Sequence, residues 1–456
     1  MKYRPYQKYK RSGIEWLGDL PDGWNTSQLK RGYSVCLGKM LQVEPKSPTD
    51  FEVPYLRAAN IQWDLVDVTD VKKMYANQVE FDSLRLLFGD LLVSEGGDVG
   101  RSAIWRNEID GCCIQNSVNR IRPLGSNSNR FLYYWLCAIK EAGYVDILCN
   151  KSTIAHFTAE KVEAVPVPFP TPDEQTAIAA FLDRETAKID TLIAKQEKLI
   201  ELLKEKRQAV ISHAVTKGLA PTVPMKPSGV EWLGDVPEHW KAAPLKRFIK
   251  QVPGAIKTGP FGSQLTSAEM QTGPIKVYNQ RSVIDADFDA GENYITEQKF
   301  SDLRGFEIAA GDILVTTRGT IGRAAIFPDM AEKGILHPCL LRIQVESTLL
   351  LREFLLTVIQ DSHLLRNQIK VLSNSTTIEV IYSETMASVV LALPPIHEQQ
   401  EIVDYLGKVT KKIDMLIAKA EQAIALQREH RTALISAAVT GKIDVREAIS
   451  DLQEAA

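Results

Sequence analysis

The chain has 456 residues, 45% hydrophobic and 24% charged, which is typical of a globular protein with roughly two to four domains. It shows no apolar run of the roughly 18–20 residues that a membrane span needs, and its basic N-terminus lacks the apolar stretch of a secretory signal, so we expect a cytoplasmic protein without membrane contact. Six cysteines without CxxC spacing and scattered histidines predict no metal site, and the net charge of −3 is not that of a strongly basic nucleic-acid binder.

The first part of the chain is expected to form a globular domain of short strands and turns. Runs rich in β-branched and aromatic residues, such as VPYLRAANI at 53–61, are separated by Gly, Pro and Asn. Residues 23–43 and 111–140 contain Lys and Arg without any acidic residue. Such windows occur by chance on ordinary surfaces and also on faces that bind DNA phosphates.

A long helix is predicted next. From Thr171 to Val215 apolar residues recur at helical spacing, and neither Pro nor Gly interrupts the run after Pro172. Thr171 and Glu174 fit a capping box, and Gly218 fits the C-terminal stop. A helix of roughly 42 residues would be about 63 Å long at 1.5 Å per residue, and its apolar stripe needs a partner.

The remaining elements repeat this order. A Pro-rich linker at 217–227 leads to a second mixed segment, in which residues 239–268 are again basic without acids, and then to a second helix from about Ile396 to Thr440. The entry to this helix lacks the Thr cap. Because the linker reaches at most about 36 Å, an antiparallel helix pair is favoured. A parallel pair stays open if the second globular domain spans most of the helix length.

An internal duplication explains this order. Residues 12–31 share 12 of 20 positions with 228–247, and residues 89–105 share 9 of 17 with 311–327. KIDTLIAK at 188–195 recurs as KIDMLIAK at 412–419. One unit of about 220 residues therefore occurs twice. Between the matching pieces the two copies diverge, which fits either the same task performed on two targets or neutral drift after duplication.

These repeated pieces resemble the specificity subunits of type I restriction–modification enzymes. The resemblance is carried by SGxEWLGxxPxxW, by GDxLVxxxGxxGRxA and by P-x-x-x-EQ at the start of a long helix, each present twice and in the same order, and it covers essentially the whole chain. It implies an α+β fold with two globular mixed α/β target-recognition domains, separated by two long antiparallel coiled-coil helices with pseudo-two-fold symmetry. The domains expected are 1–170 and 220–395 for recognition, and 171–219 and 396–456 for the helices.

The resemblance also implies function and partners. Each domain would read one half of a split double-stranded DNA sequence, and the helices would set the spacer and dock two methyltransferase (modification) subunits, with two restriction subunits as optional additions. No cofactor is expected on this chain, because S-adenosylmethionine, ATP and Mg belong to the partner subunits in this family. No catalytic residue is expected either.

Candidate DNA contacts are polar residues on predicted loops and strand ends, because base edges are read by Arg, Lys, Asn, Gln, Ser and Thr. In the first domain they are Lys39, Arg57, Asn60, Ser94, Glu95, Arg101, Gln115, Asn116, Lys151, Ser152 and Thr153. In the second they are Lys257, Thr258, Ser263, Tyr278, Asn279, Gln280, Arg281, Thr317, Arg318, Thr320, Arg323, His337, Asn374, Ser375 and Thr376. The alternative is that such residues only satisfy their own turns.

Position within the repeat separates these candidates. Arg101 and Arg323 occupy matching positions, which favours a shared phosphate-binding or structural role over base reading. The divergent pair Glu95 and Thr317 is better suited to specificity. The tryptophans at 16, 24, 232 and 240 lie in the pieces that match between the two copies, which we call the frame. Core packing or partner docking is therefore expected there instead of base stacking.

Other functions remain to be weighed. A methyltransferase would need a cofactor-binding glycine loop and a polar residue before Pro-Pro-aromatic, which Pro394-Pro395 does not provide, and EGGDVGRS lacks the features of a P-loop. A nuclease could use Asp287 with Glu297 and Lys299, but the first copy has no counterpart. A coiled-coil scaffold without DNA function would not explain why the segments between the matching pieces diverge while the matching pieces themselves are retained.

Overall fold

The computed structural model describes residues 3–149, 155–231, 233–360, 365, 367–369 and 380–446. The chain divides into two compact units, residues 1–196 with 422–456 and residues 197–421, which we call the first and the second unit. Both dividing points lie inside the long helices, so each unit contains one globular part and one half of each helix. The four domain ranges given above stay a prediction.

The first unit is built on an antiparallel sheet of four strands. Its order is β10 (Ser102–Ile104), β9 (Leu91–Ser94), β12 (Val118–Pro123) and β4 (Tyr33–Leu37). All four residues of β9 are buried, because the strand is central and covered on both faces. Helix α2 (Asn129–Glu141), with nine buried residues, belongs to the large core that also includes the helix pair.

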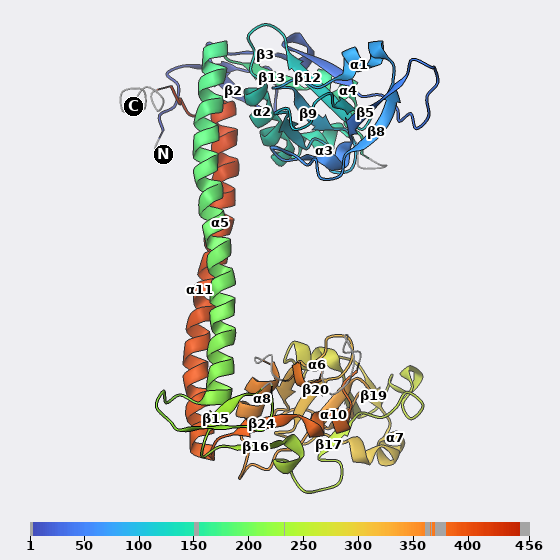
Figure 1. The fold of residues 1–456 in the computed structure, drawn as a ribbon, viewed down its shortest axis with the longest axis vertical. Coiled ribbons are helices and arrows are strands. Elements are labelled where there is room, and N and C mark those ends of the chain that lie inside the picture. The colour runs from blue at the N-terminus through green and yellow to red at the C-terminus, as the bar shows by residue number, and fades with distance from the viewer. Residues whose placement is uncertain are drawn as a thin grey trace. The chain divides into compact units, whose positions relative to one another are not determined.

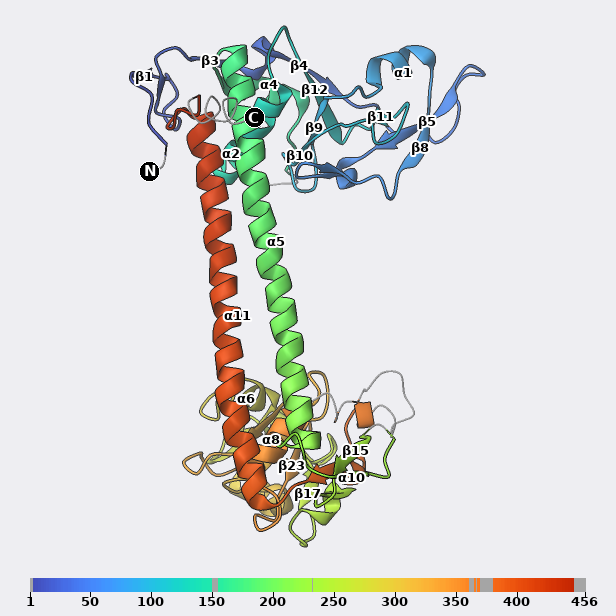
Figure 2. The same ribbon diagram turned by 60° about the vertical axis from the view of Figure 1, so that its left-hand side comes forward.

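A second, smaller sheet completes the first unit. It has the order β11 (Cys113–Ile114), β5 (Phe51–Leu56) and β8 (Lys72–Ala76), with β11 parallel to β5 and β8 antiparallel to it. Its apolar residues form a separate core with Trp105, and it lies farther from α5 than the first sheet does (Figure 2). The remaining elements are β1 (Tyr9–Arg11), β2 (Asp19–Pro21), β3 (Asn25–Gln28), β6 (Ile61–Gln62), β7 (Leu65–Val66), α1 (Gln78–Leu84), α3 (Tyr144–Leu148), α4 (Ala159–Ala164) and β13 (Pro166–Phe169).

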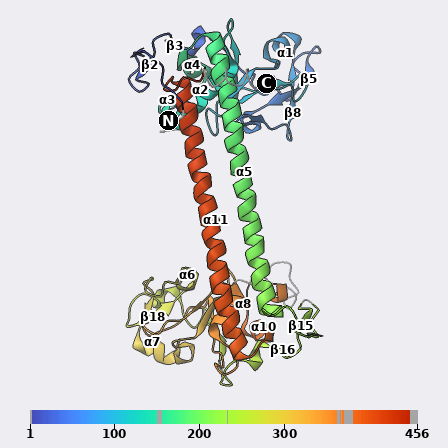
Figure 3. The same cartoon turned by 90° about the vertical axis from the view of Figure 1, so that its left-hand side faces the viewer.

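The second unit repeats this topology, which confirms the duplication. Its four-stranded sheet has the order β21 (Ala324–Ile326), β20 (Ile313–Thr316), β23 (Leu340–Ile343) and β17 (Ile256–Thr258). Its three-stranded sheet has the order β22 (Gly334–Leu336), β18 (Ile275–Tyr278) and β19 (Tyr294–Ile295), and β18 and α7 lie on the side of the unit away from α5 (Figure 3). The other elements are β14 (Met225–Pro227), β15 (Asp235–Pro237), β16 (Lys241–Pro244), α6 (Gln280–Ile284), α7 (Glu297–Asp302), α8 (Arg352–Gln360), α10 (Ser383–Ser388) and β24 (Val390–Leu393).

The two long helices have the expected limits. Helix α5 is Pro172–Lys217 and helix α11 is Ile396–Val439. Gly218 follows α5 directly and Gly441 lies two residues after the end of α11, and both have a left-handed backbone. Thr171 Oγ1 accepts a hydrogen bond from the Glu174 amide at 3.4 Å, which is one half of the expected capping box. The Glu174 carboxylate instead accepts a hydrogen bond from the Tyr6 hydroxyl at 2.6 Å.

Within each unit the two helices lie side by side and run antiparallel (Figure 1). In the first unit Asp190 of α5 pairs with Arg431 of α11 at 3.0 Å, and in the second unit Arg207 of α5 pairs with Asp414 of α11 at 3.1 Å. These two pairs are equivalent in the repeat. The antiparallel prediction is therefore confirmed within each unit, as is the α+β class. Among the described residues, no helix has the length and apolarity that a membrane crossing would require.

One glutamine at the start of each helix anchors it to the globular part. Gln175 is buried; its amide nitrogen donates to Asn127 Oδ1 at 3.0 Å and to the Pro170 carbonyl at 3.1 Å, and its oxygen accepts from the Ser128 amide at 2.9 Å. Gln399 makes the same kind of bonds, with its oxygen accepting from the Leu351 amide at 2.8 Å. The repeated P-x-x-x-EQ motif thus anchors each long helix to its globular part.

Candidate nucleic-acid interface

In the first unit the loops that follow β4, β5, β9 and β11 converge on one edge of the two sheets. The Gln115 amide donates to the Leu56 carbonyl, and the Asn116 amide donates to the Lys39 carbonyl, both at 2.9 Å. The Glu95 amide donates to the Ser117 carbonyl, also at 2.9 Å. Predicted contact residues from four separate stretches of the sequence are therefore brought together.

The second unit joins its equivalent loops in the same way. The His337 amide donates to the Tyr278 carbonyl at 3.0 Å, and the Thr317 amide donates to the Cys339 carbonyl at 2.9 Å. Gly259 approaches so closely that an added Cβ would lie 2.1 Å from the His337 carbonyl oxygen, and Gly38 has the same relation to Gln115 at 2.2 Å. Both positions therefore need glycine for the loops to meet.

Several predicted residues of the first unit form bonds within the protein. Lys39 pairs with Glu80, and its hydrogen bond to the Glu80 carboxylate lowers the pKa of that group. Lys39 also donates to Gln42 Oε1 at 2.8 Å. Arg57 pairs with Asp70. Arg101 donates to Gln62 Oε1 at 2.9 Å and lies 3.8 Å from Asp98. These cations are largely neutralised in the free protein, so each would have to exchange partners to bind a phosphate.

Four predicted contacts are buried in the free protein, so direct DNA contact by these residues stays a prediction that would require them to become exposed. Ser94 donates to the Gly96 carbonyl, and Tyr278 donates to the carbonyl of Glu332. Asn60 accepts from the Arg57 amide and donates to two carbonyls, so its amide stabilises its own loop. Thr317 is fully buried as well. Turn satisfaction, the alternative considered above, explains Ser94 and Asn60, whereas Tyr278 bonds to a residue far away in the chain.

The second unit presents more of its predicted residues to solvent. The Arg281 side chain is 85% exposed and lies 3.4 Å from Asp285. Ser263, Arg318, Thr320 and Arg323 are also exposed. Arg323 has no side-chain partner among the described residues, whereas its sequence counterpart Arg101 is held by Gln62. A shared role for these two arginines, which the matching positions suggested, is therefore not supported by their surroundings.

The other predicted residues of the second unit are half-buried. Lys257 lies 4.1 Å from the centre of the Phe306 ring, and burial, with Arg342 nearby, lowers its pKa. Asn279 caps α6 by accepting from the Arg281 amide at 2.9 Å, and Gln280 donates to the Arg318 carbonyl. His337 Nδ1 accepts from the Cys339 amide at 3.2 Å, and burial lowers the pKa of this imidazole. Thr258 lies in β17 beside these loops.

The divergent pair Glu95 and Thr317 shares an unusual feature. Glu95 Oε2 and Thr317 Oγ1 are both buried without a hydrogen-bond partner among the described residues. Burial raises the pKa of Glu95, which the charge of His156, 3.9 Å away, opposes. A buried polar atom without a partner is costly. These two positions are therefore where each domain has unused hydrogen-bonding capacity.

Six predicted contacts lie outside the described residues: Lys151, Ser152, Thr153, Asn374, Ser375 and Thr376.

Sequence reasoning missed the residues that hold the loops together. Ser117 Oγ accepts from the Ala58 amide at 3.0 Å and donates to Gln115 Oε1 at 2.9 Å. Arg120 and Arg342 are equivalent buried arginines that donate to backbone carbonyls, those of Ser83 and Gly254 among others. The signal for this pair was the arginine at the third position of both VNRIR and LLRIQ.

The structure gives little support to the nuclease alternative or to metal chemistry. Asp287 accepts from the Asp289 and Ala290 amides of its own turn, and Lys299 pairs with Glu269 at 2.7 Å, so the nuclease-like residues are used locally. Among the described residues, no group of three or more His, Cys, Asp or Glu could hold a metal ion.

The frame tryptophans pack as expected where they are described. Trp24 and Trp240 are buried in the cores of their units. Trp16 is 41% exposed and packs against Tyr144, with ring centres 4.5 Å apart. Trp232 lies outside the described residues.

Comparison with known proteins agrees with this duplicated architecture. The family model of the type I restriction modification DNA specificity domain matches residues 22–202 and 265–425. The chain is 23% identical over 444 residues to the type I restriction enzyme StySPI specificity subunit of Salmonella potsdam, covering 93% of this chain and 90% of that one.

Solved structures share the fold. A chain from a structure on complex assembly and conformational transition of the type I R-M system superposes with a TM-score of 0.63 at 17% identity, covering 93% of this chain and 99% of that one. The HsdS subunit from Thermoanaerobacter tengcongensis gives a TM-score of 0.52 at 17% identity, covering 93% and 98%. With two matched domains on a duplicated fold, the chain belongs to the type I restriction–modification specificity family, whose task is DNA target recognition.

Proposed function

We propose that each globular part reads one half of a bipartite DNA target and that the chain itself performs no catalysis. The observation that carries this is the pair of converged loop sets, built on one topology but lined by different side chains. Two copies of one scaffold with different contact residues suit two different half-sites. Two related readers also suit DNA, where half-sites on one face repeat about every helical turn.

The proposed contacts are the predicted loop residues that are exposed or half-buried in the free protein. They are Glu95, Gln115 and Asn116 in the first unit, with Lys39, Arg57 and Arg101 available after partner exchange, and Lys257, Thr258, Ser263, Asn279, Gln280, Arg281, Arg318, Thr320, Arg323 and His337 in the second. Arg318 replaces Gly96 of the first copy and is suited to guanine, whose O6 and N7 accept from a guanidinium. Arg323 is suited to a phosphate.

The partners follow from the family. The chain would dock two modification subunits, which carry S-adenosylmethionine and methylate the target, and two restriction subunits in systems that have them, which use ATP and Mg. Support comes from the relatives, which are named as specificity subunits of type I restriction enzymes, and from the neighbour in a structure on complex assembly. Modification subunits that surround the duplex would also explain why this chain, with a net charge of −3, is not strongly basic.

The test is to map methylated bases in a host that expresses the chain with its modification subunit, with and without deletion of the chain. A bipartite motif that disappears on deletion is expected. Replacing residues 32–150 with the equivalent segment of a relative of known target should then change one half of the motif only. An unchanged motif would favour a scaffold over a reader.

Single substitutions sharpen this test. Arg318→Gln should alter the base preferred at one position of the second half-site, by about tenfold. Arg323→Gln should instead weaken binding to all sequences alike and reduce the slope of log affinity against log salt by about one. Equal effects of both variants on all sequences would contradict the assignment of Arg318 to a base.

A further inference from the structure

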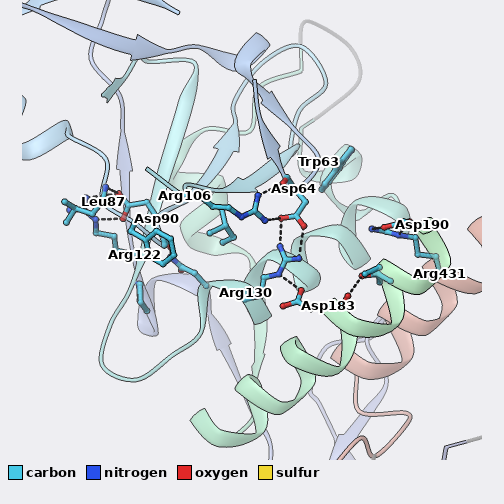
Figure 4. A pocket seen from close by; sticks show the side chains of 17 residues that line it. Trp63, Asp64, Leu87, Asp90, Arg106, Arg122, Arg130, Asp183, Asp190 and Arg431 are labelled. Carbon is cyan, nitrogen blue, oxygen red and sulfur yellow. Dashed lines mark hydrogen bonds and ion pairs between the residues drawn. The ribbon is translucent and has the colours of Figure 1, made fainter. Parts of the chain in front are cut away.

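A groove of about 920 Å³ in the first unit has an ion-pair network across its floor (Figure 4). Arg130 of α2 lies at its centre, between Asp64 of the globular part and Asp183 of α5. Arg130 Nε is 2.6 Å from Asp183 Oδ1, and its two terminal nitrogens donate to the two carboxylate oxygens of Asp64, one of them at 2.7 Å. The planar guanidinium therefore bridges both carboxylates at once.

The surroundings fix this arginine in one orientation. Its guanidinium carbon lies 4.6 Å from the centre of the Tyr133 ring and 4.9 Å from that of Tyr134. The Tyr134 hydroxyl also donates to Asp183 Oδ1 at 2.7 Å. The Arg130 side chain is only 23% exposed, so these contacts are less screened by solvent than those of a surface ion pair.

Asp64 connects this network to the loops of the candidate DNA interface. It lies in the turn between β6 and β7, with a left-handed φ of 56°, and its amide donates to the Ser102 carbonyl at 3.0 Å. Two residues earlier, Gln62 accepts from Arg101, which also donates to the Ala58 carbonyl. A continuous series of contacts thus leads from the loop at 57–62, through Asp64 and Arg130, to α5.

Among the residues that the structure describes, the second unit has no equivalent of this series. The Ser128 and Leu351 amides bond to the equivalent anchors Gln175 and Gln399, which makes Arg130 equivalent to Glu353. Counting along the long helices from the same anchors makes Asp183 equivalent to Gly407. The Glu353 carboxylate lies 3.9 Å from Arg352 of its own helix. The link between α2 and the long helix therefore involves charges that the second copy lacks.

We infer that Arg130 is a positioning residue that fixes the DNA-facing loops of the first domain on α5 and thereby restricts the spacing between half-sites that the protein accepts. This rests on the proposed function. A reader held at one angle on its helix meets the bases only at one spacing, because adding or removing a base pair rotates a half-site around the duplex as well as shifting it. A recognition domain that is held less rigidly on its helix can follow that rotation and therefore accepts other spacings.

The experiment uses the full chain in complex with its modification subunit. Transfer of a labelled methyl group is measured on duplexes that carry both half-sites and a spacer of native length, or one base pair longer or shorter. Asp183→Ala removes the α5 side of the link, leaves the Arg130–Asp64 pair in place and favours the helix. Asp183→Glu keeps the carboxylate and serves as the conservative variant.

Asp190→Ala is the matched control. Asp190 is also an α5 carboxylate, 53% exposed against 45% for Asp183, and it also pairs with an arginine, but that partner is Arg431 of α11. If the network positions the reader, methylation at the altered spacers relative to the native one rises about tenfold in Asp183→Ala, and stays at the wild-type ratio in Asp183→Glu and Asp190→Ala.

The other outcomes overturn the inference. If Asp183→Ala keeps the wild-type spacer preference, or if Asp190→Ala weakens that preference equally, the network only stabilises the fold. A wild-type complex without any bipartite preference overturns the proposed function and this inference with it. If Asp183→Ala lowers methylation of all three duplexes by the same factor, its role is structural and the positioning role is rejected.

Discussion

The two units share one topology but use their polar residues differently. In the frame, the same contacts recur: the buried anchors Gln175 and Gln399, and the pairs Asp190–Arg431 and Arg207–Asp414. At the candidate DNA interface the contacts do not recur. Arg101 is bonded within the first unit, whereas its counterpart Arg323 is exposed in the second.

This difference shows which constraints act on each part of the molecule. Frame residues must satisfy buried backbone groups at the start of each helix, and few side chains can do so. Loop residues lie over the ends of the sheets and can vary without loss of the core. The first unit presents an interface that is already internally bonded and linked to α5 through Arg130, while the second presents exposed arginines, Arg318 and Arg323. We therefore expect binding at the second half-site to depend more steeply on salt.

The largest effects should come from the shared frame. Gln175→Ala and Gln399→Ala each remove a buried amide and leave several backbone groups without partners. We expect each to cost about 3 kcal/mol of stability, because an unsatisfied buried group costs about 1–3 kcal/mol. Calorimetry gives the change in Tm, and hydrogen exchange should place the loss of protection at the start of α5 or of α11 respectively.

Gln400→Ala provides the control for these anchors. Gln400 is an exposed residue next to Gln399, and its amide bonds only to Asp404 within the same helix at 3.0 Å. Its replacement should change stability by less than about 0.5 kcal/mol. If Gln399→Ala were as mild as Gln400→Ala, the role of the motif as an anchor of the helix would be wrong.

The sequence predicted those elements whose pattern is long and local. Both long helices followed from apolar periodicity, the first one also from its terminal Gly218, and the frame tryptophans followed from their place in the repeat. The two-sheet arrangement could not be predicted, because β11 is two residues long and pairs in parallel with β5, far away in the chain. Pairings of this kind leave no local signal.

The hydrogen-bond partners of individual polar side chains could not be predicted from the sequence either. Asn60 is a typical adenine-reading residue type, yet its amide bonds to the carbonyls of Asp67 and Asp70. Arg101 and Arg323 match in sequence, but only the first has a neighbour like Gln62. Whether a loop residue faces solvent or closes its own turn depends on partners that the repeat does not conserve.

A smaller difference between the units is expected at the frame tryptophans. Trp240 Nε1 donates to Glu398 at 2.9 Å, while Trp24 Nε1 is buried without a partner among the described residues. Replacement by Phe removes the same atoms from both cores, so the loss of packing should be similar. Trp240→Phe should therefore cost about 1–2 kcal/mol more than Trp24→Phe, because it also breaks a hydrogen bond to a carboxylate.

Denaturant unfolding of the two variants measures this difference directly. Glu398→Gln, which keeps an acceptor for the indole N–H, should fall between the wild type and Trp240→Phe. Equal stabilities of the two tryptophan variants would mean that the indole hydrogen bond contributes nothing in the second unit.

The smallest effect concerns pH and the divergent pair. Burial raises the pKa of Glu95, so the folded chain holds this proton more tightly than the unfolded chain does. The contribution of Glu95 to stability therefore falls as pH rises from the ordinary pKa of a glutamate, about 4.3, through the raised value, and stays unfavourable above it. Glu95→Thr should relieve this penalty, and the equivalent Thr317 shows that the scaffold accepts a threonine here.

At pH 8 the Glu95→Thr variant should be more stable than the wild type by about 1 kcal/mol, the cost of a poorly satisfied buried acceptor, and the gap should close as the pH falls below about 4.3. Glu44→Thr, at an exposed position, is the control and should change stability at pH 8 by less than about 0.5 kcal/mol. A gap that stays constant with pH would mean that the carboxylate is solvated in the folded chain. In that case its unused hydrogen-bonding capacity could not distinguish the first reader from the second, and the difference between the domains would have to lie in the exposed arginines alone.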